Sequence, residues 1–471
     1  MTHFELLIIG TGSGNSILTS DFEKTSVAIV ERGLFGGTCL NVGCIPSKMF
    51  VYAAEMAHHA QVDGPRLGVH TSFDGVDWPA IRDRVFGRID PIAEGGERYR
   101  ADEQENVTVY KGSARFTGDK EVEVAMNDGS TEVVTADRVV LAAGARVSVP
   151  QMILDSGVDY HTSDTIMRVD ELPEHLIVLG GGYIGAELGN VFGSLGSKLT
   201  ILNRSAQLIR FEDPDISSRF TEEYSKRFDV RLNAQLVSLS QDGKDISITI
   251  DQGNGPEVIT GDAFLVATGR IPNGEELNVT ATGVELDDRG YVITDEYLQT
   301  AHPDIWALGD ITNPHQLKHL ANIDARAVAH NMVNPDDLRA IDRNCSPHAV
   351  FGYPQVASVG LTEPQAVEAG LNIVTTVHEY GGAAYGWAME DTTSVCKLIA
   401  DADTRLLLGA HIIGPQASTL IQQLIQGMAF GTTVDQMARD QIYIHPALTP
   451  KLSSRRCSIS KSGVIPARTA G

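Results

Sequence analysis

The sequence predicts an α/β fold: two Rossmann-type dinucleotide-binding domains followed by a smaller C-terminal α+β domain. A glycine-rich turn directly follows an apolar strand at Gly10 and again at Gly180, 170 residues later. The alternation of polar and apolar residues over 394–399 is typical of a strand in an antiparallel sheet packed with helices. A chain of 471 residues is too long for one hydrophobic core, so several domains are expected.

The first turn, Gly10-Thr11-Gly12-Ser13-Gly14-Asn15, opens a helix-compatible segment. Its glycines let the backbone N–H groups approach a pyrophosphate, and a helix N-terminus adds positive potential. The glycines concerned are Gly10, Gly12 and Gly14. Glu31, 21 residues past Gly10 at the end of the next strand, stands where a carboxylate binds ribose hydroxyls. Asn15 replaces the third glycine of the pattern, and a tight turn without a nucleotide is the alternative.

The second turn, Gly180-Gly181-Gly182-Tyr183-Ile184-Gly185, has glycine at all three required positions, namely Gly180, Gly182 and Gly185. The next strand ends at Asn203, whereas an acidic residue there would bind an NADH ribose and repel a 2′-phosphate. Arg204 and Arg210 follow and can contact such a phosphate through charge-assisted hydrogen bonds. The pattern therefore favours NADPH over NADH, with merely solvated arginines as the alternative.

Two cysteines, Cys39 and Cys44, are separated by four residues and precede a helix predicted over Met49–Ala57. A helix N-terminus lowers the pKa of a nearby thiol, and Lys48 adds to this effect. Zinc, the natural rival, requires a second Cys or His pair at similar spacing, and no metal is expected because the sequence has none. The isolated cysteines, Cys345, Cys396 and Cys457, are predicted to be inert. The pair is therefore predicted to be redox-active.

The composition argues against several partners. The chain has 61 acidic and 37 basic side chains and a formal net charge of −24, so it would repel DNA, RNA and anionic membranes. No apolar run approaches the roughly 18 residues of a membrane span, and a signal peptide is not expected. Five cysteines do not suggest a secreted disulfide scaffold. We therefore expect a cytoplasmic protein with a small-molecule substrate.

These segments resemble the class I pyridine nucleotide–disulfide oxidoreductases over residues 4 to about 449. Besides both turns and the cysteine loop, the resemblance rests on Leu141–Gly144, Ala267–Asn273, Ile305–Asp310 and His445-Pro446. It implies FAD at the first turn, NADPH at the second, a redox-active disulfide and a homodimer with a shared active site.

The resemblance also implies roles around the flavin. Asp310 would bind the ribityl chain, and Tyr183 would cover the flavin until the nicotinamide displaces it. Lys48 and Glu187 would form an ion pair near the reactive flavin nitrogen. The matching stretches give three further cofactor-binding residues: Thr38, Gly144 and Arg270.

On the sulfur side, the resemblance implies that Cys44 faces the flavin, Cys39 attacks the substrate and His445 of the partner subunit is the base. In the family a glutamate five residues later orients this histidine, but here that position is Pro450. The basic segment from Pro450 onward lacks apolar periodicity, and suitable codons read one base out of register encode an amphipathic helix beginning with Glu. We hypothesise a frameshift or sequencing error after about Thr449, which independent sequencing of the gene's 3′ end tests.

Four features narrow the substrate. Ile17–Asp21 lacks the arginines with which glutathione reductase grips its anionic disulfide, and Asn203 stands where dihydrolipoamide dehydrogenase has an acidic residue. The vicinal cysteine pair that mercuric reductase needs near its C-terminus is missing. Phe86–Ile92 and Leu317–Asn322 resemble mycothione reductases, a branch of the family, although the first stretch also reads as an ordinary amphipathic helix. Mycothiol disulfide is therefore the predicted substrate. The alternatives are a lipoamide-type dehydrogenase and a flavoprotein inactivated by its altered C-terminus.

The predicted domains are a flavin domain over residues 1–145, an NADPH domain over 146–269, a flavin return segment over 270–340, and a dimerisation domain over 345–471 that is anomalous after 449.

Overall fold

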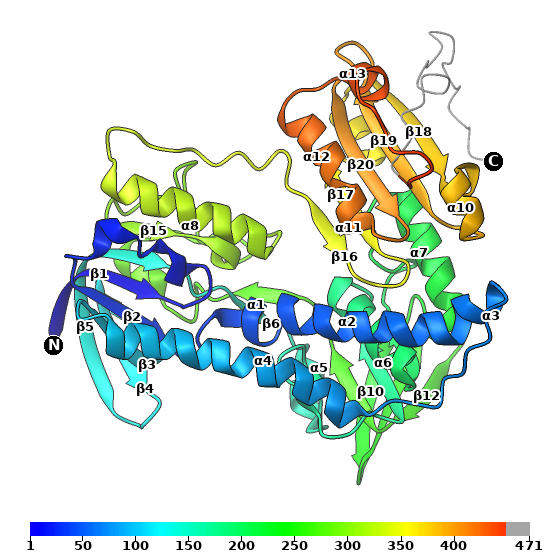
Figure 1. Cartoon of the computed structure of the whole chain (residues 1–471). Helices are drawn as coiled ribbons and strands as arrows, with labels where there is room; N and C mark the ends of the chain where they lie inside the picture. The colour runs from blue at the N-terminus through cyan, green and yellow to red at the C-terminus, as the bar shows by residue number, and fades with distance from the viewer. Residues whose placement is uncertain (449–471) are drawn as a thin grey trace. The chain divides into compact units, whose positions relative to one another are not determined.

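The computed structural model describes residues 1–448, which form two compact units (Figure 1). The first comprises residues 1–206 and 228–343, and the second comprises residues 207–227 and the chain from residue 344 onward. The predictions for Cys457, Pro450 and the altered C-terminus lie outside the described residues. Within residues 1–448, no helix combines the length and apolar character that crossing a membrane requires.

The first unit begins with a sheet whose central strand is β1 (Thr2–Ile9). Its other strands are β2 (Val27–Glu31), β3 (Val107–Gly118), β4 (Glu121–Met126), β5 (Thr131–Leu141) and β15 (Ile305–Ala307). Parallel pairing joins β3, β2, β1, β5 and β15 in that order, while β4 pairs antiparallel with both β3 and β5. The last four residues of β1 are buried, as expected of a parallel strand covered on both faces. The sheet thus includes one strand from far along the chain.

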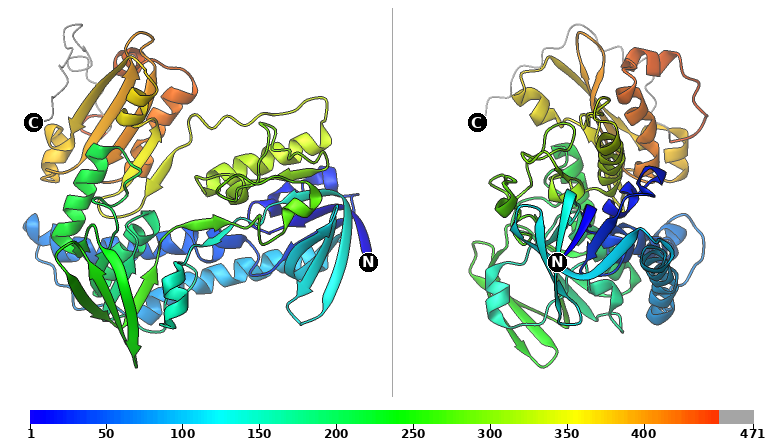
Figure 2. Two further views of the ribbon diagram at one scale, coloured as in Figure 1. Left: turned by 180° about the vertical axis from the view of Figure 1, so that it is seen from behind. Right: turned by 90° about the vertical axis from the view of Figure 1, so that its left-hand side faces the viewer.

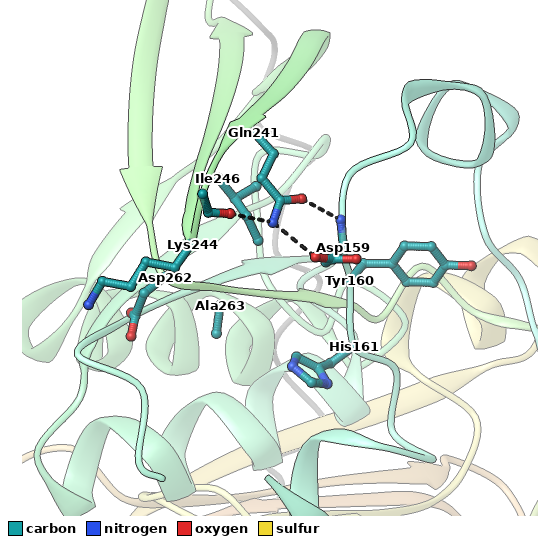
Figure 3. A pocket seen from close by; sticks show the side chains of 9 residues that line it. Asp159, Tyr160, His161, Gln241, Lys244, Ile246, Asp262 and Ala263 are labelled. Atoms are coloured by element: carbon teal, nitrogen blue, oxygen red, sulfur yellow. Dashed lines mark hydrogen bonds between the residues drawn. The ribbon is translucent and has the colours of Figure 1, made fainter. Parts of the chain in front are cut away.

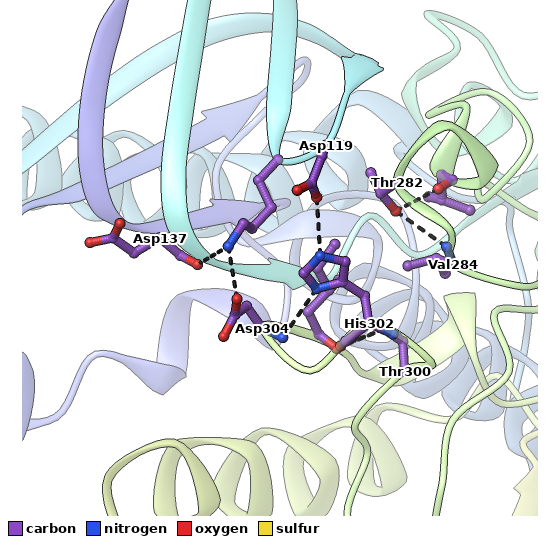
Figure 4. Close-up of polar contacts among 10 residues, drawn as sticks. Asp119, Asp137, Thr282, Val284, Thr300, His302 and Asp304 are labelled. Atoms are coloured by element: carbon purple, nitrogen blue, oxygen red, sulfur yellow. Dashed lines mark hydrogen bonds and ion pairs between the residues drawn. The ribbon is translucent and has the colours of Figure 1, made fainter.

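Polar contacts tie the turn between β3 and β4 to the residues ahead of β15 (Figure 4). His302 Nε2 lies 3.0 Å from Asp119 Oδ1, and the backbone N–H of Asp304 donates to His302 Nδ1. Lys120 Nζ donates to the Asp304 carboxylate over 2.8 Å and to the backbone carbonyl of Asp137. Each solvent-facing pair stabilises by about 0–1 kcal/mol, so their effect is to fix where the returning chain meets the sheet.

The segment after the first glycine turn forms two short 3-10 helices, η1 (Gly14–Ile17) and η2 (Ser20–Phe22), and the expected helix is absent there. Only residues 15–26 connect this turn to β2, so any regular helix here would have to be short. Small polar side chains also bond the local backbone: Ser16 Oγ donates to the Ser13 carbonyl, and Thr19 Oγ1 accepts from the Asp21 N–H. The prediction of a helix dipole at this turn was therefore wrong.

The α-helices of the first unit are α1 (Gly37–Asn41), α2 (Cys44–His58), α3 (Gly64–Arg66), α4 (Trp78–Arg98), α5 (Gln151–Ser156), α6 (Tyr183–Leu195) and α8 (Lys318–Val333). The predicted helix over Met49–Ala57 lies inside α2, which runs beside α4 (Figure 2). An aromatic cluster joins α2, α4 and α6. The Phe50 ring lies 5.2 Å from Trp78 and 6.2 Å from Phe86, and the Trp78 ring lies 5.2 Å from Phe192. Phe86 is buried, so packing in this cluster is enough to explain an aromatic residue at that position.

The nucleotide half contains a four-stranded parallel sheet in the order β13-β7-β8-β9. Its strands are β7 (His175–Leu179), β8 (Lys198–Leu202), β9 (Asp229–Arg231) and β13 (Ala263–Val266). An antiparallel sheet adds β10 (Gln235–Asp242), β11 (Asp245–Asp251) and β12 (Pro256–Gly261). The chain enters and leaves this half through a two-stranded ribbon, β6 (Ala145–Val147) paired with β14 (Arg270–Pro272).

A surface pocket of about 580 Å³ lies between the loop Asp159–His161 and the β10–β11 hairpin (Figure 3). Its wall includes Lys244, and the backbone N–H of Asp159 donates to the Gln241 side chain. The lining contains no cysteine and no residue of either glycine turn. This pocket is therefore separate from the site predicted from the sequence.

The second unit is built on an antiparallel sheet in the order β16-β17-β20-β19-β18. The strands are β16 (His348–Val350), β17 (Val356–Gly360), β18 (Ile373–Glu379), β19 (Val395–Asp401) and β20 (Leu407–Ile413). The antiparallel sheet predicted from residues 394–399 is confirmed, but the first six residues of β19 are all buried. Helices α7 (Pro214–Arg227) and α12 (Gln422–Ala429) both contact β20, and α7 comes from within the residues predicted as NADPH domain.

A buried lysine fastens α7 to this sheet. Lys397 of β19 is 3% exposed and bonds Asp213, Asp215 and Glu363 at 2.8, 2.7 and 2.6 Å. Burial alone would lower the pKa of Lys397, but the hydrogen bonds to these carboxylates raise it. Beside them, His348 Nε2 lies 2.6 Å from the buried Glu212 carboxylate. The segment 207–227 thus joins the second unit through ion pairs as well as packing.

Candidate active site around Cys39 and Cys44

The two cysteines lie on consecutive helices. Cys39 is in α1, and Cys44 is the first residue of α2 after the N-cap Gly43. Gly37 has φ +65°, and a Cβ on it would lie 2.8 Å from the Cα of Gly12. Only glycine permits that approach, so the backbone of the cysteine loop lies directly against the first glycine turn.

Both cysteines are free thiols, and their pKa values are displaced in opposite directions. The hydrogen bond from Cys39 lowers the pKa of Cys44 to about 7, against burial and with help from the Lys48 charge. The same hydrogen bond, together with burial, raises the pKa of Cys39. The reduced pair therefore carries its charge on Cys44 and its proton on Cys39, and a base must act before Cys39 can attack.

Lys48 and Glu187 form the ion pair that the resemblance implies. Lys48 Nζ lies 2.7 Å from Glu187 Oε2, which joins α2 to α6. Lys48 follows Cys44 by one helical turn, so both side chains lie on one face of α2. The charges of both residues act on the Cys44 thiol in opposite senses. The ion pair is therefore beside the sulfur that carries the negative charge.

Tyr183 lies at the N-terminus of α6 and is 43% exposed. Desolvation of its phenol raises the pKa to about 12, because the hydroxyl end lies among protein atoms although the rest of the residue is open. Arg270, Asp310, Glu187 and Cys44 are all close enough for their charges to act on this phenol. Four sequence-predicted segments therefore converge around Tyr183.

Asp310 lies in the short 3-10 helix η7 (Gly309–Ile311). Burial raises the pKa of its carboxyl group, while the charges of Arg270 and Lys318 oppose the increase. Asp310 is partly buried, and within residues 1–448 the buried Nε of Arg270 has no hydrogen-bond partner. An unpaired buried donor is costly, so this N–H group of Arg270 fits a cofactor that offers an acceptor.

The first glycine turn packs closely against Ala142, directly after β5. A Cβ on Gly10, at φ +102°, would lie 2.4 Å from the Ala142 carbonyl oxygen, and one on Gly14 would lie 2.5 Å from the Ala142 Cβ. Gly14 thus provides the close packing usually given by the third glycine, which explains why Asn15 is tolerated. Gly144 has φ +65° with open space beside it.

Glu31 is placed at this turn as predicted from its spacing. Its Oε2 accepts from the Thr11 N–H at 2.9 Å and from Thr11 Oγ1 at 2.6 Å, and its Oε1 accepts from the Gly33 N–H. A carboxylate offers about four lone-pair positions, so acceptor capacity remains for ribose hydroxyls. Thr38 is exposed in α1, next to Gly37.

The second glycine turn has the geometry of a phosphate-binding turn. A Cβ on Gly180 would lie 2.3 Å from the Ala267 carbonyl oxygen, and one on Gly185 would lie 2.0 Å from the Gly180 carbonyl oxygen. A Cβ on Gly182, the N-cap of α6, would meet nothing within 4 Å. Open space at the N-terminus of a thirteen-residue helix fits an anionic group.

The three residues that favour NADPH do not all lie in the same compact unit. Asn203 is buried, and its side-chain amide donates to the Ser205 carbonyl at 2.8 Å. Arg204 is exposed directly after β8. Arg210 belongs to the second unit, where its guanidinium lies over the Phe211 ring at 4.8 Å. Its role at the nucleotide stays a prediction.

His445 also belongs to the second unit and is exposed. Cys396 is buried in β19, and Cys345 is partly buried. Neither is near a second cysteine in the sequence, and their inert role stays a prediction. Two basic residues at the first turn, Arg100 and Lys318, were not predicted from the sequence. Lys318 lies within Leu317–Asn322, the stretch that resembles mycothione reductases, and this resemblance could have pointed to it.

Comparison with known proteins identifies the family. The family model described as pyridine nucleotide-disulphide oxidoreductase matches residues 4–332, and the model of its dimerisation domain matches residues 346–455. Mycothione reductase of Mycobacterium tuberculosis (strain H37Rv) is 47% identical over 95% of this chain and 97% of its own. Mercuric reductase of Streptomyces lividans is 35% identical over 95% and 94%.

Among solved structures, the HOCl-induced flavoprotein disulfide reductase RclA from Escherichia coli matches with a TM-score of 0.81 and 28% identity, covering 95% of this chain and 98% of that one. The match covers both units of the fold and agrees with an α/β flavoprotein architecture. The chain belongs to the pyridine nucleotide–disulfide oxidoreductases, and FAD and NADPH are its cofactors.

Proposed function

We propose that this disulfide oxidoreductase reduces the disulfide of mycothiol with electrons from NADPH. The observation that carries the proposal is 47% identity with mycothione reductase over 95% of the chain. The absence of arginine from Ile17–Asp21 supports it, because a sugar-bearing disulfide needs no clamp for carboxylates. In this segment Ile17 is buried and Asp21 is exposed.

Bound FAD supplies the two-electron link between NADPH and the cysteine pair. In the proposed cycle the Cys39–Cys44 disulfide accepts two electrons and one proton, giving a Cys44 thiolate and a Cys39 thiol. Lys48 stabilises the thiolate, and Glu187 holds Lys48 in place. Tyr183 covers the nicotinamide side until NADPH arrives. Asp310 orients the cofactor through its ribityl hydroxyls.

Cys39 then loses its proton to a base and attacks the substrate disulfide, which releases one thiol and leaves a mixed disulfide. The Cys44 thiolate attacks the Cys39 sulfur, releases the second thiol and restores the protein disulfide. The net change is one disulfide and NADPH with a proton converted to two thiols and NADP⁺. Within its own subunit Cys39 stays protonated, because the hydrogen bond to Cys44 and burial raise its pKa. We therefore propose His445 of the partner subunit as the base.

The proposal therefore includes a homodimer with an active site shared between subunits. The match to a dimerisation domain over residues 346–455 supports the dimer. Asn203, Arg204 and Arg210 are the proposed residues for NADPH preference, and the cytoplasm is the proposed location, because a thiol-based reduction cycle suits a reducing compartment.

The test is NADPH consumption by the purified holoenzyme with mycothiol disulfide, lipoamide, oxidised glutathione and a quinone. Turnover with mycothiol disulfide well above the other disulfides supports the proposal. Preferred turnover of lipoamide would replace mycothiol by a lipoamide-type substrate. Quinone reduction without turnover of any disulfide would point to a flavoprotein that cannot finish catalysis, and the residues after Thr449 would be repaired next.

A further inference from the structure

The first glycine turn lacks the electrostatic support that a following helix gives. The η1 helix after it has four residues, so little macrodipole develops at its N-terminus. The pyrophosphate of FAD is a dianion, and a turn that binds it needs positive potential. Two basic side chains from other elements supply charge at this turn.

Arg100 is the first of these cations. It is 7% exposed and lies in η4 (Tyr99–Glu103), a π-helical turn that follows α4. Its Nε donates to Asn15 Oδ1 at 2.7 Å and its Nη2 to the Asn15 carbonyl at 2.8 Å, while Nη1 donates to Gln104. These acceptors are neutral, and within residues 1–448 no carboxylate pairs with it. Burial lowers the pKa of Arg100, which reflects a charge without compensation.

Lys318 is the second cation. It begins α8, and its Nζ lies 2.9 Å from Ser13 Oγ, which in turn donates to Asn322 Oδ1 at 3.1 Å. Ser13 is 7% exposed, so the ammonium group reaches a buried part of the turn. In the described part of the chain Lys318 has no ion-pair partner, although its charge acts on Asp310 and on Cys39.

We infer that Arg100 and Lys318 bind the FAD pyrophosphate electrostatically at the Gly10–Asn15 turn, in place of the absent helix. Their anchors, Ser13 and Asn15, flank Gly14, and each cation arrives from a different element of the first unit. A buried guanidinium and a half-buried ammonium group with only neutral partners form a site for an anion. The inference rests on FAD as the cofactor and is independent of which disulfide is reduced.

The first test compares Lys318→Met, Lys318→Arg and the matched control Lys24→Met, which removes an exposed lysine of the same unit. FAD affinity of the apoprotein is measured by flavin fluorescence at low and high salt, with riboflavin as the ligand that lacks the pyrophosphate. Charge-assisted contacts predict a loss of about 10- to 100-fold in FAD affinity for Lys318→Met. The loss shrinks with salt, and riboflavin binding stays unchanged. Lys318→Arg and Lys24→Met are expected to bind like the wild type.

Equal FAD affinity of Lys318→Met and Lys24→Met at low salt would overturn the assignment of Lys318. An equal loss of riboflavin affinity would overturn it too, because the effect would not depend on the phosphates. A change confined to the alkylation rate of Cys39 would mean that Lys318 serves the thiol and not the cofactor. A wild-type apoprotein that takes up no FAD would instead refute the proposed function.

The second test uses Arg100→Lys and Arg100→Met, with exposed Arg98→Met as the control and circular dichroism as the check of folding. Arg100→Lys keeps the charge without the bidentate grip on Asn15, so FAD affinity is expected between those of the wild type and Arg100→Met. If Arg100→Met does not fold, Arg100→Lys carries the test. Wild-type FAD affinity and salt dependence in Arg100→Lys would overturn the role of Arg100.

Discussion

Cys39 and Cys44 are five positions apart, yet they hold their protons with very different strength. The difference arises from one hydrogen bond, donated by Cys39, and from the ammonium group of Lys48 on the next turn of α2. A thiolate at Cys44 near neutral pH is suited to closing a mixed disulfide, because thiolates are the nucleophiles in such exchange. A protonated Cys39 makes the attack on the substrate depend on a base.

The first prediction concerns the pH dependence of Cys44 in the reduced protein. Since the pKa of Cys44 is lowered to about 7, its alkylation is expected to reach half of the maximal rate near pH 7. At lower pH the rate is expected to decrease, because less of the thiolate is present. Cys39→Ala removes the donor and Lys48→Met removes the charge, so each shifts the profile to higher pH. Iodoacetamide rates with mass-spectrometric assignment measure this. An unshifted profile in Cys39→Ala would contradict the hydrogen-bond account.

At the scale of elements, the first glycine turn packs against the strand end at Ala142 with no room for another carbon. A Cβ on Gly14 would approach the Ala142 Cβ to 2.5 Å, whereas one on Gly87 inside α4 would meet nothing within 4 Å. The two glycines therefore differ in purpose: the first permits a contact, and the second only lowers helix propensity.

Gly14→Ala is expected to lower the free energy of unfolding by about 1–3 kcal/mol, because β1 or the turn must shift to relieve the overlap. Gly87→Ala is expected to raise it by up to about 1 kcal/mol. Urea unfolding of both variants, together with FAD content after purification, measures the difference. Equal stability of the two variants would mean that the turn is less tightly packed than described.

The Lys397 cluster gives the second prediction at this scale. Lys397→Met leaves the fully buried Asp213 without its cation, which is expected to cost about 3–5 kcal/mol of unfolding free energy. The control Lys226→Met breaks exposed pairs and should cost less than about 1 kcal/mol. A loss no larger than in the control, by urea unfolding, would show that the cluster is not a stabilising contact.

The cluster also has a defined pH dependence. Burial is the largest single influence on the pKa of Asp213 and would raise it, but the hydrogen bonds from Lys397 and from the backbone N–H groups of Glu363 and Asp215, together with the Lys397 charge, lower it overall. A lowered folded-state pKa means that the contribution is present above the unfolded carboxyl pKa, about 3.9, and is lost as pH falls through the folded value. The stability difference between wild type and Lys397→Met is therefore expected to shrink in acid.

The sequence was sufficient for the strands and turns and insufficient for the contacts between them. Both glycine turns and the cysteine helix have local causes, namely apolar runs, glycine spacing and helix periodicity. The helix expected after Gly14 is missing because the connection to β2 is short and polar. The prediction followed the glycine pattern, which is usually succeeded by a helix, and did not take this short polar connection into account. The contacts of Asn15 with Arg100 and of Ser13 with Lys318 span 85 and 305 residues, a separation that no periodicity encodes.

At the scale of the whole molecule, the proposed reaction needs both compact units and a second subunit. The first unit holds the cysteines and both glycine turns, and the second holds His445 and the sheet that matches a dimerisation domain. The flavin half of the reaction therefore requires no residue of the second unit apart from the proposed Arg210, whereas the disulfide half does.

His445→Gln tests this division. Quinone reduction by NADPH is expected to stay unchanged, because it needs only the flavin, while disulfide turnover is expected to fall by about 10²- to 10⁴-fold through loss of the base. Steady-state assays of both reactions on the same preparation measure the ratio. A parallel loss of both activities would contradict the division, and unchanged disulfide turnover would exclude His445 as the base.

Anaerobic titration of the holoenzyme with NADPH, followed by counting of reactive thiols, tests most directly whether electrons pass through FAD to Cys39 and Cys44. The account predicts that the wild type takes up one NADPH more per subunit than the flavin alone requires and exposes a new pair of thiols. Cys39→Ser is predicted to reduce its flavin and expose no new pair. Full flavin reduction in the wild type without new thiols at Cys39 and Cys44 would contradict the account.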